Sequence, residues 1–117
     1  MTTLTMKSRL GKLISRGRIQ RLADEIARKF HPKKVILFGS YATRKATVDS
    51  DVDIFVILRP GSRGVDSLRV HRGITHDFPM DLIVMTARKF DDRLGEGDFF
   101  LMDVVEQGIV LYEENHA

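Results

Sequence analysis

Three short apolar runs place the strongest constraint on the fold of this chain. They cover residues 35–38, 52–58 and 82–85, and apolar side chains fill both alternating positions of each run except at Asp53. A strand with one solvated face alternates apolar and polar residues, so these runs are typical of interior strands that are covered on both faces. Helices must supply that cover, and the sequence therefore predicts an α/β (α+β) fold.

The helices of the first part of the chain are predicted from the spacing of apolar residues. From Ile19 to Phe30 they recur every three or four positions, which lays one stripe along a helix, and His31-Pro32 is expected to end it. Residues 61–79 have turn residues at both ends and a weak apolar spacing between them, which indicates one short helix. Residues 1–17 are expected to add a basic N-terminal helix or arm.

The last third of the chain is predicted to hold two helices and one strand. Thr86 and Asp98 are typical N-cap residues for helices over 87–94 and 99–107, each of which is followed by a glycine. Residues 109–112 would form a short final strand. Four residues of the second helix are expected to belong to the core: Phe99, Phe100, Met102 and Val105.

Composition narrows the class of protein and its chemistry. At 117 residues, with 43% apolar and 30% charged residues, the chain is expected to form one soluble domain over 1–117. Its longest uninterrupted apolar run, Ile54 to Leu58, is far shorter than the ~20 residues of a membrane span, and its polar start lacks the core of a signal peptide, so we expect no membrane association and a cytoplasmic location. The absence of cysteine excludes disulfides, thiolate nucleophiles and Cys-based metal sites.

The charge of the chain is divided between its two parts. Residues 1–45 carry 12 Lys or Arg and 2 acids, whereas residues 46–117 carry 7 Lys or Arg and 14 acids. The basic part could attract nucleic acid, nucleotide phosphates or an acidic protein surface, and a solvated helix face explains it equally well. Nucleic-acid binding without catalysis is the least favoured function that we consider for it.

Three carboxylates lie at the starts of two of the predicted strands. Asp51 and Asp53 are two residues apart, so their side chains share one face of a strand at a separation of about 6.6 Å along it. Asp81 opens the third apolar run, and it would join them if the two strands lie side by side in register. Oxygen ligands of this kind suit Mg²⁺ bound together with nucleotide phosphates, although ordinary turn and strand-start aspartates would give the same pattern.

Gly39 and Ser40 end the first apolar run and start a turn. A strand that ends in Gly-Ser and enters a short helix directs backbone N–H groups and a hydroxyl at one point, which favours binding of an anion such as phosphate. The P-loop pattern of a second glycine followed by lysine is absent, and Gly-Ser alone is also a common turn. The spacing of this turn from the acids makes it informative.

The combination of Gly39-Ser40, Asp51-x-Asp53 and Asp81 resembles the minimal nucleotidyltransferase (MNT) family of the DNA polymerase β superfamily. The resemblance extends over nearly the whole chain, from the amphipathic first helix to the tail at 106–113. It implies a polymerase-β-like nucleotidyltransferase fold, with a three-stranded mixed core flanked by helices. Arg44 departs from the family pattern, because a glycine is common at that position.

The same resemblance implies a site and a reaction. Asp51, Asp53 and Asp81 would be the catalytic residues and would hold two Mg²⁺ ions. Gly39 and Ser40 would bind the β and γ phosphates of ATP or another nucleoside triphosphate. A hydroxyl would then attack the α-phosphorus in line and release pyrophosphate.

Two kinds of function are compatible with this sequence. The first is an enzyme that transfers a nucleoside monophosphate, expected to be AMP, onto a hydroxyl of a partner protein. In the MNT family that partner is typically a helical HEPN-domain toxin, which would make this chain an antitoxin, and we expect no further domain that would bind a small-molecule acceptor. The second is a non-catalytic antitoxin or nucleotide-binding module that occludes its partner.

Several other polar and aromatic residues are not expected to serve the reaction directly. His71 and His76 are five residues apart, which does not match a helical pair of metal ligands, so we expect them at the surface. Tyr41 could stack on a base, and packing is the favoured role. Arg44 and Lys45 could touch the triphosphate or lie exposed at the end of the turn.

Overall fold

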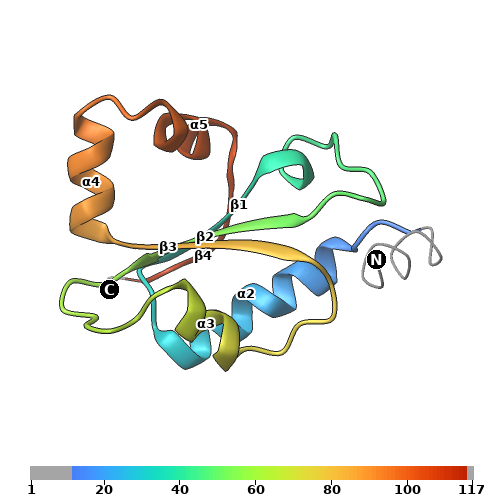
Figure 1. The fold of residues 1–117 in the computed structure, drawn as a ribbon, viewed down its shortest axis with the longest axis horizontal. Helices are drawn as coiled ribbons and strands as arrows, with labels where there is room; N and C mark the ends of the chain where they lie inside the picture. Colours follow the sequence, from blue (N-terminus) through green and yellow to red (C-terminus); the bar gives the residue numbers. More distant parts are fainter. Residues whose placement is uncertain (1–11, 116–117) are drawn as a thin grey trace.

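A four-stranded mixed sheet forms the centre of the protein in the computed structural model, which describes residues 12–115 (Figure 1). The strands, in the spatial order β3-β2-β1-β4, have these bounds: β1 (Lys34–Phe38), β2 (Val52–Leu58), β3 (Met80–Thr86) and β4 (Ile109–Glu113). Strand β1 runs antiparallel to β2 and to β4, whereas β2 and β3 are parallel. The three apolar runs are thus confirmed as neighbouring strands, and β4 adds one strand to the three-stranded core that was expected.

Helices cover both faces of this sheet (Figure 1). Their bounds in the described chain are α2 (Arg16–Phe30), the short 3-10 helix η1 (Gly39–Tyr41), α3 (Ser67–Gly73), α4 (Ala87–Gly95) and α5 (Phe99–Gln107). Helices α2 and α3 pack on one face, and α4 and α5 pack on the other. No helix within residues 12–115 is both long enough and apolar enough to cross a membrane.

The alternation of side chains along β2 separates the two cores. Val52, Ile54 and Val56 are fully buried on the face covered by α2 and α3. Phe55 and Ile57 point the opposite way and pack with α4 and α5. Successive side chains of a strand point to opposite faces, so Asp53 belongs to the α4–α5 face.

Helix α2 begins earlier than its apolar stripe. The Ser15 side chain accepts a hydrogen bond from the backbone N–H of Arg18 at 3.2 Å, so Ser15 is the N-cap and three residues precede Ile19 in the helix. Helix α2 ends at His31-Pro32 as predicted, and the structure shows that His31 adopts the left-handed conformation there. The helix or arm expected over 1–17 falls mostly on residues 1–11, which lie outside the described residues, and residues 12–15 are not helical.

The two predicted caps of the second half are confirmed. Thr86 accepts from the N–H of Lys89 at 3.2 Å and Asp98 from that of Leu101 at 3.1 Å, so α4 and α5 start where the sequence placed them. Each cap satisfies one of the N–H groups that a helix start leaves without a partner.

The prediction that four apolar residues of α5 belong to the core is wrong for all four. Phe99 is 85% exposed, Phe100 45%, Met102 37% and Val105 52%, whereas Leu101 and Val104 are buried. A nine-residue helix that rests on a sheet buries only one side, and the hydrophobic composition of α5 exceeds what that side can hold. The surplus apolar side chains face outward.

Arg44 occupies a strained position just after η1. Its φ of 63° lies in the left-handed region, which costs an L-residue about 1–2 kcal/mol and costs glycine almost nothing. The turn is closed by hydrogen bonds from Ala42 and Thr43 to the Gly39 carbonyl and from Lys45 to the Ser40 carbonyl, and these fix the path through Arg44. A glycine at this position is therefore favoured by backbone conformation.

We expect Arg44→Gly to raise the free energy of unfolding by about 0.5–1 kcal/mol, because relief of the strain is partly offset by the larger entropy of glycine in the unfolded chain. Urea denaturation measures this change. Arg44→Ala is the matched control, since it removes the same charge and keeps the unfavourable φ. An equal gain from both variants would assign the effect to the charge instead of the backbone.

Candidate active site

The parallel pairing of β2 and β3 brings two carboxylates together. Asp53 and Asp81 are Cα partners in this register, so they lie on the same face of adjacent strands, which are about 4.8 Å apart. Asp53 is half-buried and Asp81 is exposed. The sequence-based expectation that these two residues would meet if the strands were in register is confirmed.

Asp51 lies near this pair without joining it closely. It is exposed and precedes the first residue of β2, and its charge still acts on Asp53. Within residues 12–115, no group of three or more His, Asp or Glu side chains is arranged tightly enough to hold a metal ion. The predicted cluster of three carboxylates is therefore present as an adjacent pair with a third carboxylate at its edge.

Burial and like charge raise the pKa of Asp53. Its carboxyl is shifted from 3.8 to about 6, chiefly by desolvation, next by the negative charges of Asp81 and Asp51, and last by the hydrogen bond with Asp81. Each of these contributions disfavours the ionised form. In the absence of a cation, the site thus holds its negative charge at a cost in free energy.

Gly39 faces the Asp53 carboxylate directly. Its φ is 73°, and a Cβ built on it would overlap Oδ2 of Asp53 and lie 3.0 Å from Cγ. Phe38, the residue before it, is the Cα partner of Asp53 across β1 and β2, which explains the contact. Glycine is therefore required here both by the backbone conformation and by the close approach of the carboxylate.

Ser40 lies in η1 directly after Gly39, the residue that faces Asp53. The donors that close the turn are the N–H groups of Ala42, Thr43 and Lys45, and these bond to the carbonyls of Gly39 and Ser40. The first N–H groups of a helix have no partner inside it, so they are the ones that an anion can use. The structure thus places Gly39, Ser40, Asp53 and Asp81 around one end of the sheet.

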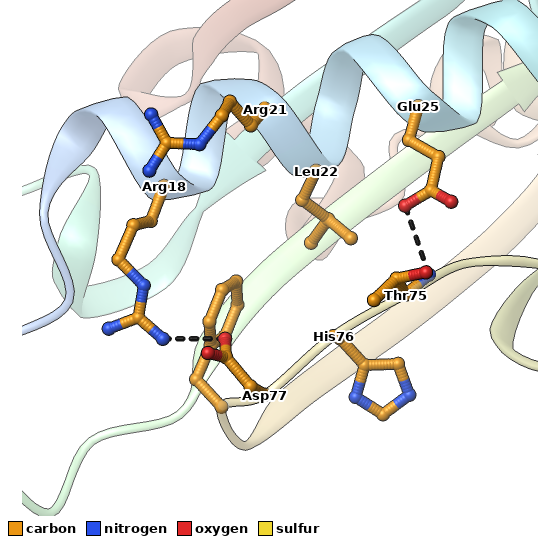
Figure 2. Close-up of a pocket in the computed structure, with 8 residues that line it drawn as sticks. Arg18, Arg21, Leu22, Glu25, Thr75, His76 and Asp77 are labelled. Atoms are coloured by element: carbon orange, nitrogen blue, oxygen red, sulfur yellow. Dashed lines mark hydrogen bonds and ion pairs between the residues drawn. The ribbon is translucent and has the colours of Figure 1, made fainter.

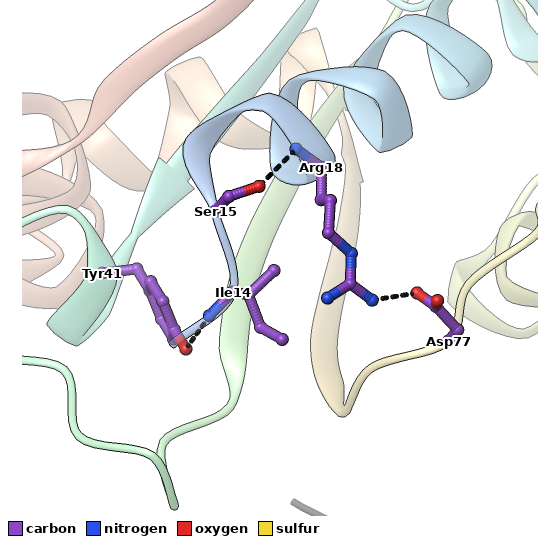
Figure 3. A network of polar contacts seen from close by, with 5 residues as sticks. All are labelled: Ile14, Ser15, Arg18, Tyr41 and Asp77. Carbon is purple, nitrogen blue, oxygen red and sulfur yellow. Dashed lines mark hydrogen bonds and ion pairs between the residues drawn. The ribbon is translucent and has the colours of Figure 1, made fainter. Parts of the chain in front are cut away.

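Tyr41 holds the turn to the segment before α2. Its hydroxyl accepts a hydrogen bond from the backbone N–H of Ile14 at 3.1 Å, and its ring packs against the core (Figure 3). This contact joins residues 27 positions apart in the chain. The favoured packing role of Tyr41 is confirmed, and the hydrogen bond to Ile14 is a contact that sequence reasoning missed.

Helix α2 also holds the connection that leads into β3, and sequence reasoning missed this as well. Arg18 pairs with Asp77 at 2.5 Å, and Glu25 accepts from the N–H of Thr75 at 2.9 Å (Figure 2). Lys29 adds a bond of 2.9 Å to the Gly73 carbonyl. The three α2 residues are spaced seven and four apart, which places them on one side of a helix, and that spacing was the available signal.

A cleft of about 340 Å³ lies between α2 and this connection (Figure 2). It opens on the α2–α3 side of the sheet, away from the face that carries Asp53. Next to it, the rings of His71 and His76 are 4.2 Å apart and both residues are half-buried, so they lie at the surface only in part, and their ring contact was missed by sequence reasoning. Helix α3 ends between them at Gly73, and the chain then turns back.

The raised pKa of Asp53 predicts a pH-dependent stability. Because the folded pKa of about 6 exceeds the unfolded value of 3.8, the folded state binds the proton more tightly, and stability falls as pH rises through that window. We expect Asp53→Asn to raise the melting temperature of the metal-free protein at pH 7.5 and to change it little at pH 4. Thermal unfolding in EDTA at both pH values checks this, and Asp49→Asn serves as the control.

Comparisons with known proteins agree with this geometry. The sequence profile described as a nucleotidyltransferase domain matches residues 19–111. A crystal structure from Sulfolobus solfataricus, described as that of a candidate nucleotidyltransferase, has a similar fold, with a TM-score of 0.57 and 18% sequence identity. The similarity covers 97% of this chain and 89% of the other. No curated protein gives a significant sequence match. The profile spans most of the chain, including Gly39, Asp53 and Asp81, and the protein therefore belongs to the nucleotidyltransferase domain family.

Proposed function

We propose that this nucleotidyltransferase domain transfers AMP from ATP onto a hydroxyl group of a partner protein in a magnesium-dependent reaction. The observation that carries the proposal is the Asp53–Asp81 pair directly beside the Gly39-Ser40 turn. Carboxylates next to an anion-binding turn are the arrangement that a metal-bound nucleotide triphosphate needs. We further propose a cytoplasmic location, as composition predicted.

The donor set fits Mg²⁺. Hard oxygen ligands are the ones that this ion prefers, and it is commonly bound by one or two carboxylates together with substrate phosphates. Asp53 and Asp81 would hold it, with Asp51 at the edge as a further ligand for a second ion. The mutual repulsion that raises the pKa of Asp53 is the feature that a cation would relieve. When bound, Mg²⁺ would neutralise charge that develops on the phosphates.

Different residues of the chain would position the phosphates and the acceptor hydroxyl. Gly39 leaves room for the Asp53 carboxylate beside the turn, and Ser40 would donate its hydroxyl to the β or γ phosphate. Asp81, the more exposed member of the pair, would accept a hydrogen bond from the acceptor hydroxyl and orient its oxygen toward the α-phosphorus. A new O–P bond would form there as the hydroxyl proton passes to Asp81, the bond from the α-phosphorus to the bridging oxygen would break, and pyrophosphate would leave.

The acceptor is proposed from the resemblance to MNT antitoxins. On that basis the partner is a HEPN-domain protein, and the transferred AMP would neutralise it as a toxin. A second candidate function is an antitoxin that acts by occlusion alone. One observation favours it: Arg44, at a position where the MNT family commonly has glycine, holds a left-handed backbone conformation.

Removing the charge of Asp81 separates the two functions. We expect Asp81→Asn to lower label transfer from α-³²P-ATP to a co-purified HEPN-domain partner by about 100-fold or more, since the carboxylate is exposed and its loss should spare the fold. Partner binding, followed by size-exclusion chromatography, should be unchanged. Asp49→Asn is the matched control, because Asp49 is an exposed aspartate outside the paired strands.

Two outcomes would contradict the enzymatic proposal. If the parent protein transfers no label under conditions in which it binds the partner, the chain is not an active transferase. If Asp81→Asn neutralises the partner as well as the parent protein does, occlusion is sufficient.

Ligand binding should also stabilise the fold. We expect Mg²⁺ and ATP together to raise the melting temperature more than either does alone, because the metal relieves the carboxylate repulsion and the nucleotide bridges the metal and the turn. Differential scanning fluorimetry measures this shift. Asp53→Asn should reduce it, and melting curves that are identical with and without millimolar Mg-ATP would contradict the site.

A further inference from the structure

Helix α5 carries a row of exposed apolar side chains. Phe99, Met102 and Val105 follow one another at intervals of three residues, so they lie along one side of the helix. They are 85%, 37% and 52% exposed, while Leu101 and Val104 anchor the opposite side in the core. We call the row Phe99–Met102–Val105 the α5 ridge.

Exposed apolar residues elsewhere in the described chain do not form such a row. Leu13, Leu68 and Val110 are 51%, 54% and 48% exposed and stand singly on three different segments, and Leu68 on α3 lies on the opposite face of the sheet from α5. Single exposed apolar side chains are normal at a protein surface, whereas a contiguous group is typical of an interaction site. Within the described surface, the α5 ridge is therefore the strongest candidate for an interaction site.

The ridge adjoins the candidate active site through Phe100. The ring of this half-exposed residue is 5.6 Å from the ring of Phe38 and 6.4 Å from that of Phe55. Phe38 is the Cα partner of Asp53, and Phe55 is two residues beyond Asp53 on the same face of β2. A molecule seated on the ridge would therefore lie next to the carboxylate pair.

The chain segment that forms the ridge is acidic, and the neighbouring helix α4 adds three cations, Arg88, Lys89 and Arg93, beside the acids Asp91 and Asp92. Residues 94–117 contain no Lys or Arg and six carboxylates: Glu96, Asp98, Asp103, Glu106, Glu113 and Glu114. Asp98, Glu113 and Glu114 are paired with basic residues of the rest of the chain. Asp103 and Glu106, which stand on α5 itself, are exposed and form no ion pair with another described residue. An apolar row with free acids beside it is complementary to an apolar surface flanked by cations.

We propose that the α5 ridge is the docking surface for a protein partner that presents an apolar helical face flanked by Lys or Arg. A ridge of side chains at three-residue spacing fits the groove between the ridges of another helix. The charges argue against a second copy in a two-fold contact, because that would place the acids of α5 against themselves. They equally disfavour the phosphates of nucleic acid or of an anionic lipid surface.

Docking on this ridge would identify the surface that binds the partner in the proposed function. It rests on that function in one respect only: the docked partner would present its acceptor hydroxyl to Asp53 and Asp81. The docking itself requires neither ATP nor Mg²⁺. Asp53→Asn should therefore leave it intact while abolishing transfer, and this makes the two proposals separable.

Two synthetic helical peptides provide the test. Both carry the same leucine stripe and a fluorescein label, and one is flanked by lysines and the other by glutamates. Fluorescence anisotropy with the full chain should show binding of the lysine peptide, and weaker binding of the glutamate peptide by about tenfold or more. Phe99→Gln combined with Met102→Gln should weaken binding of the lysine peptide by about tenfold or more, with an unchanged melting temperature because both side chains are exposed.

Leu68→Gln is the matched control, since it removes an equally exposed apolar residue from the other face and should not change binding. Asp103→Lys combined with Glu106→Lys should reverse the preference between the two peptides. The proposal is overturned if the lysine peptide does not bind at millimolar concentration, if both peptides bind equally, or if the ridge and Leu68 variants behave alike. Sedimentation that reveals a dimer of the parent protein, lost in the ridge variant, would assign the surface to a second copy.

Discussion

The close approach of the Asp53 and Asp81 carboxylates is the constraint on which the rest of this site depends. Two acids on adjacent parallel strands repel each other, and burial adds to the cost, so the pKa of Asp53 rises to about 6. Such a pair is tolerated only where something else offsets the repulsion. The pair lies at the end of the sheet beside the Gly39 turn, and the Mg²⁺ ion of the proposed function is the group that would offset the repulsion.

The loops that border the carboxylate pair are held by contacts with α2 and with the segment before it. Helix α2 packs on the opposite face of the sheet, yet its side chains reach the connection into β3 through Asp77, Thr75 and Gly73 (Figure 2). The segment before α2 also reaches η1 through Tyr41 (Figure 3). These contacts are mostly exposed and individually weak, but together they fix both loops that border the site.

The distribution of apolar surface links the site to its surroundings. Phe38 and Phe55 fill the space beside Asp53, Phe100 covers them in part, and the α5 ridge continues outward from there. The exposed carboxylates of α5 lie on this side of the sheet, and the cations of α2 lie on the other side. Under the proposed docking, a partner with cations beside its apolar face would favour the α5 side.

The sequence by itself determined the local elements of this protein. The apolar runs at 52–58 and 82–85, the caps Thr86 and Asp98, and the Gly39 turn all follow from patterns within a few residues, and each lies where it was predicted. The pairing of Asp53 with Asp81 could be stated only as a condition, because register depends on how distant strands align.

Tertiary structure decided what depends on contacts between distant segments. The side of α5 that is buried, the bond from Ile14 to Tyr41 and the ion pair between Arg18 and Asp77 join residues far apart in the chain. An apolar residue such as Phe99 looks the same in sequence whether the sheet covers it or leaves it exposed. The area of the sheet that is available to α5 determines whether Phe99 is covered or exposed. That area is fixed only when all four strands have assembled.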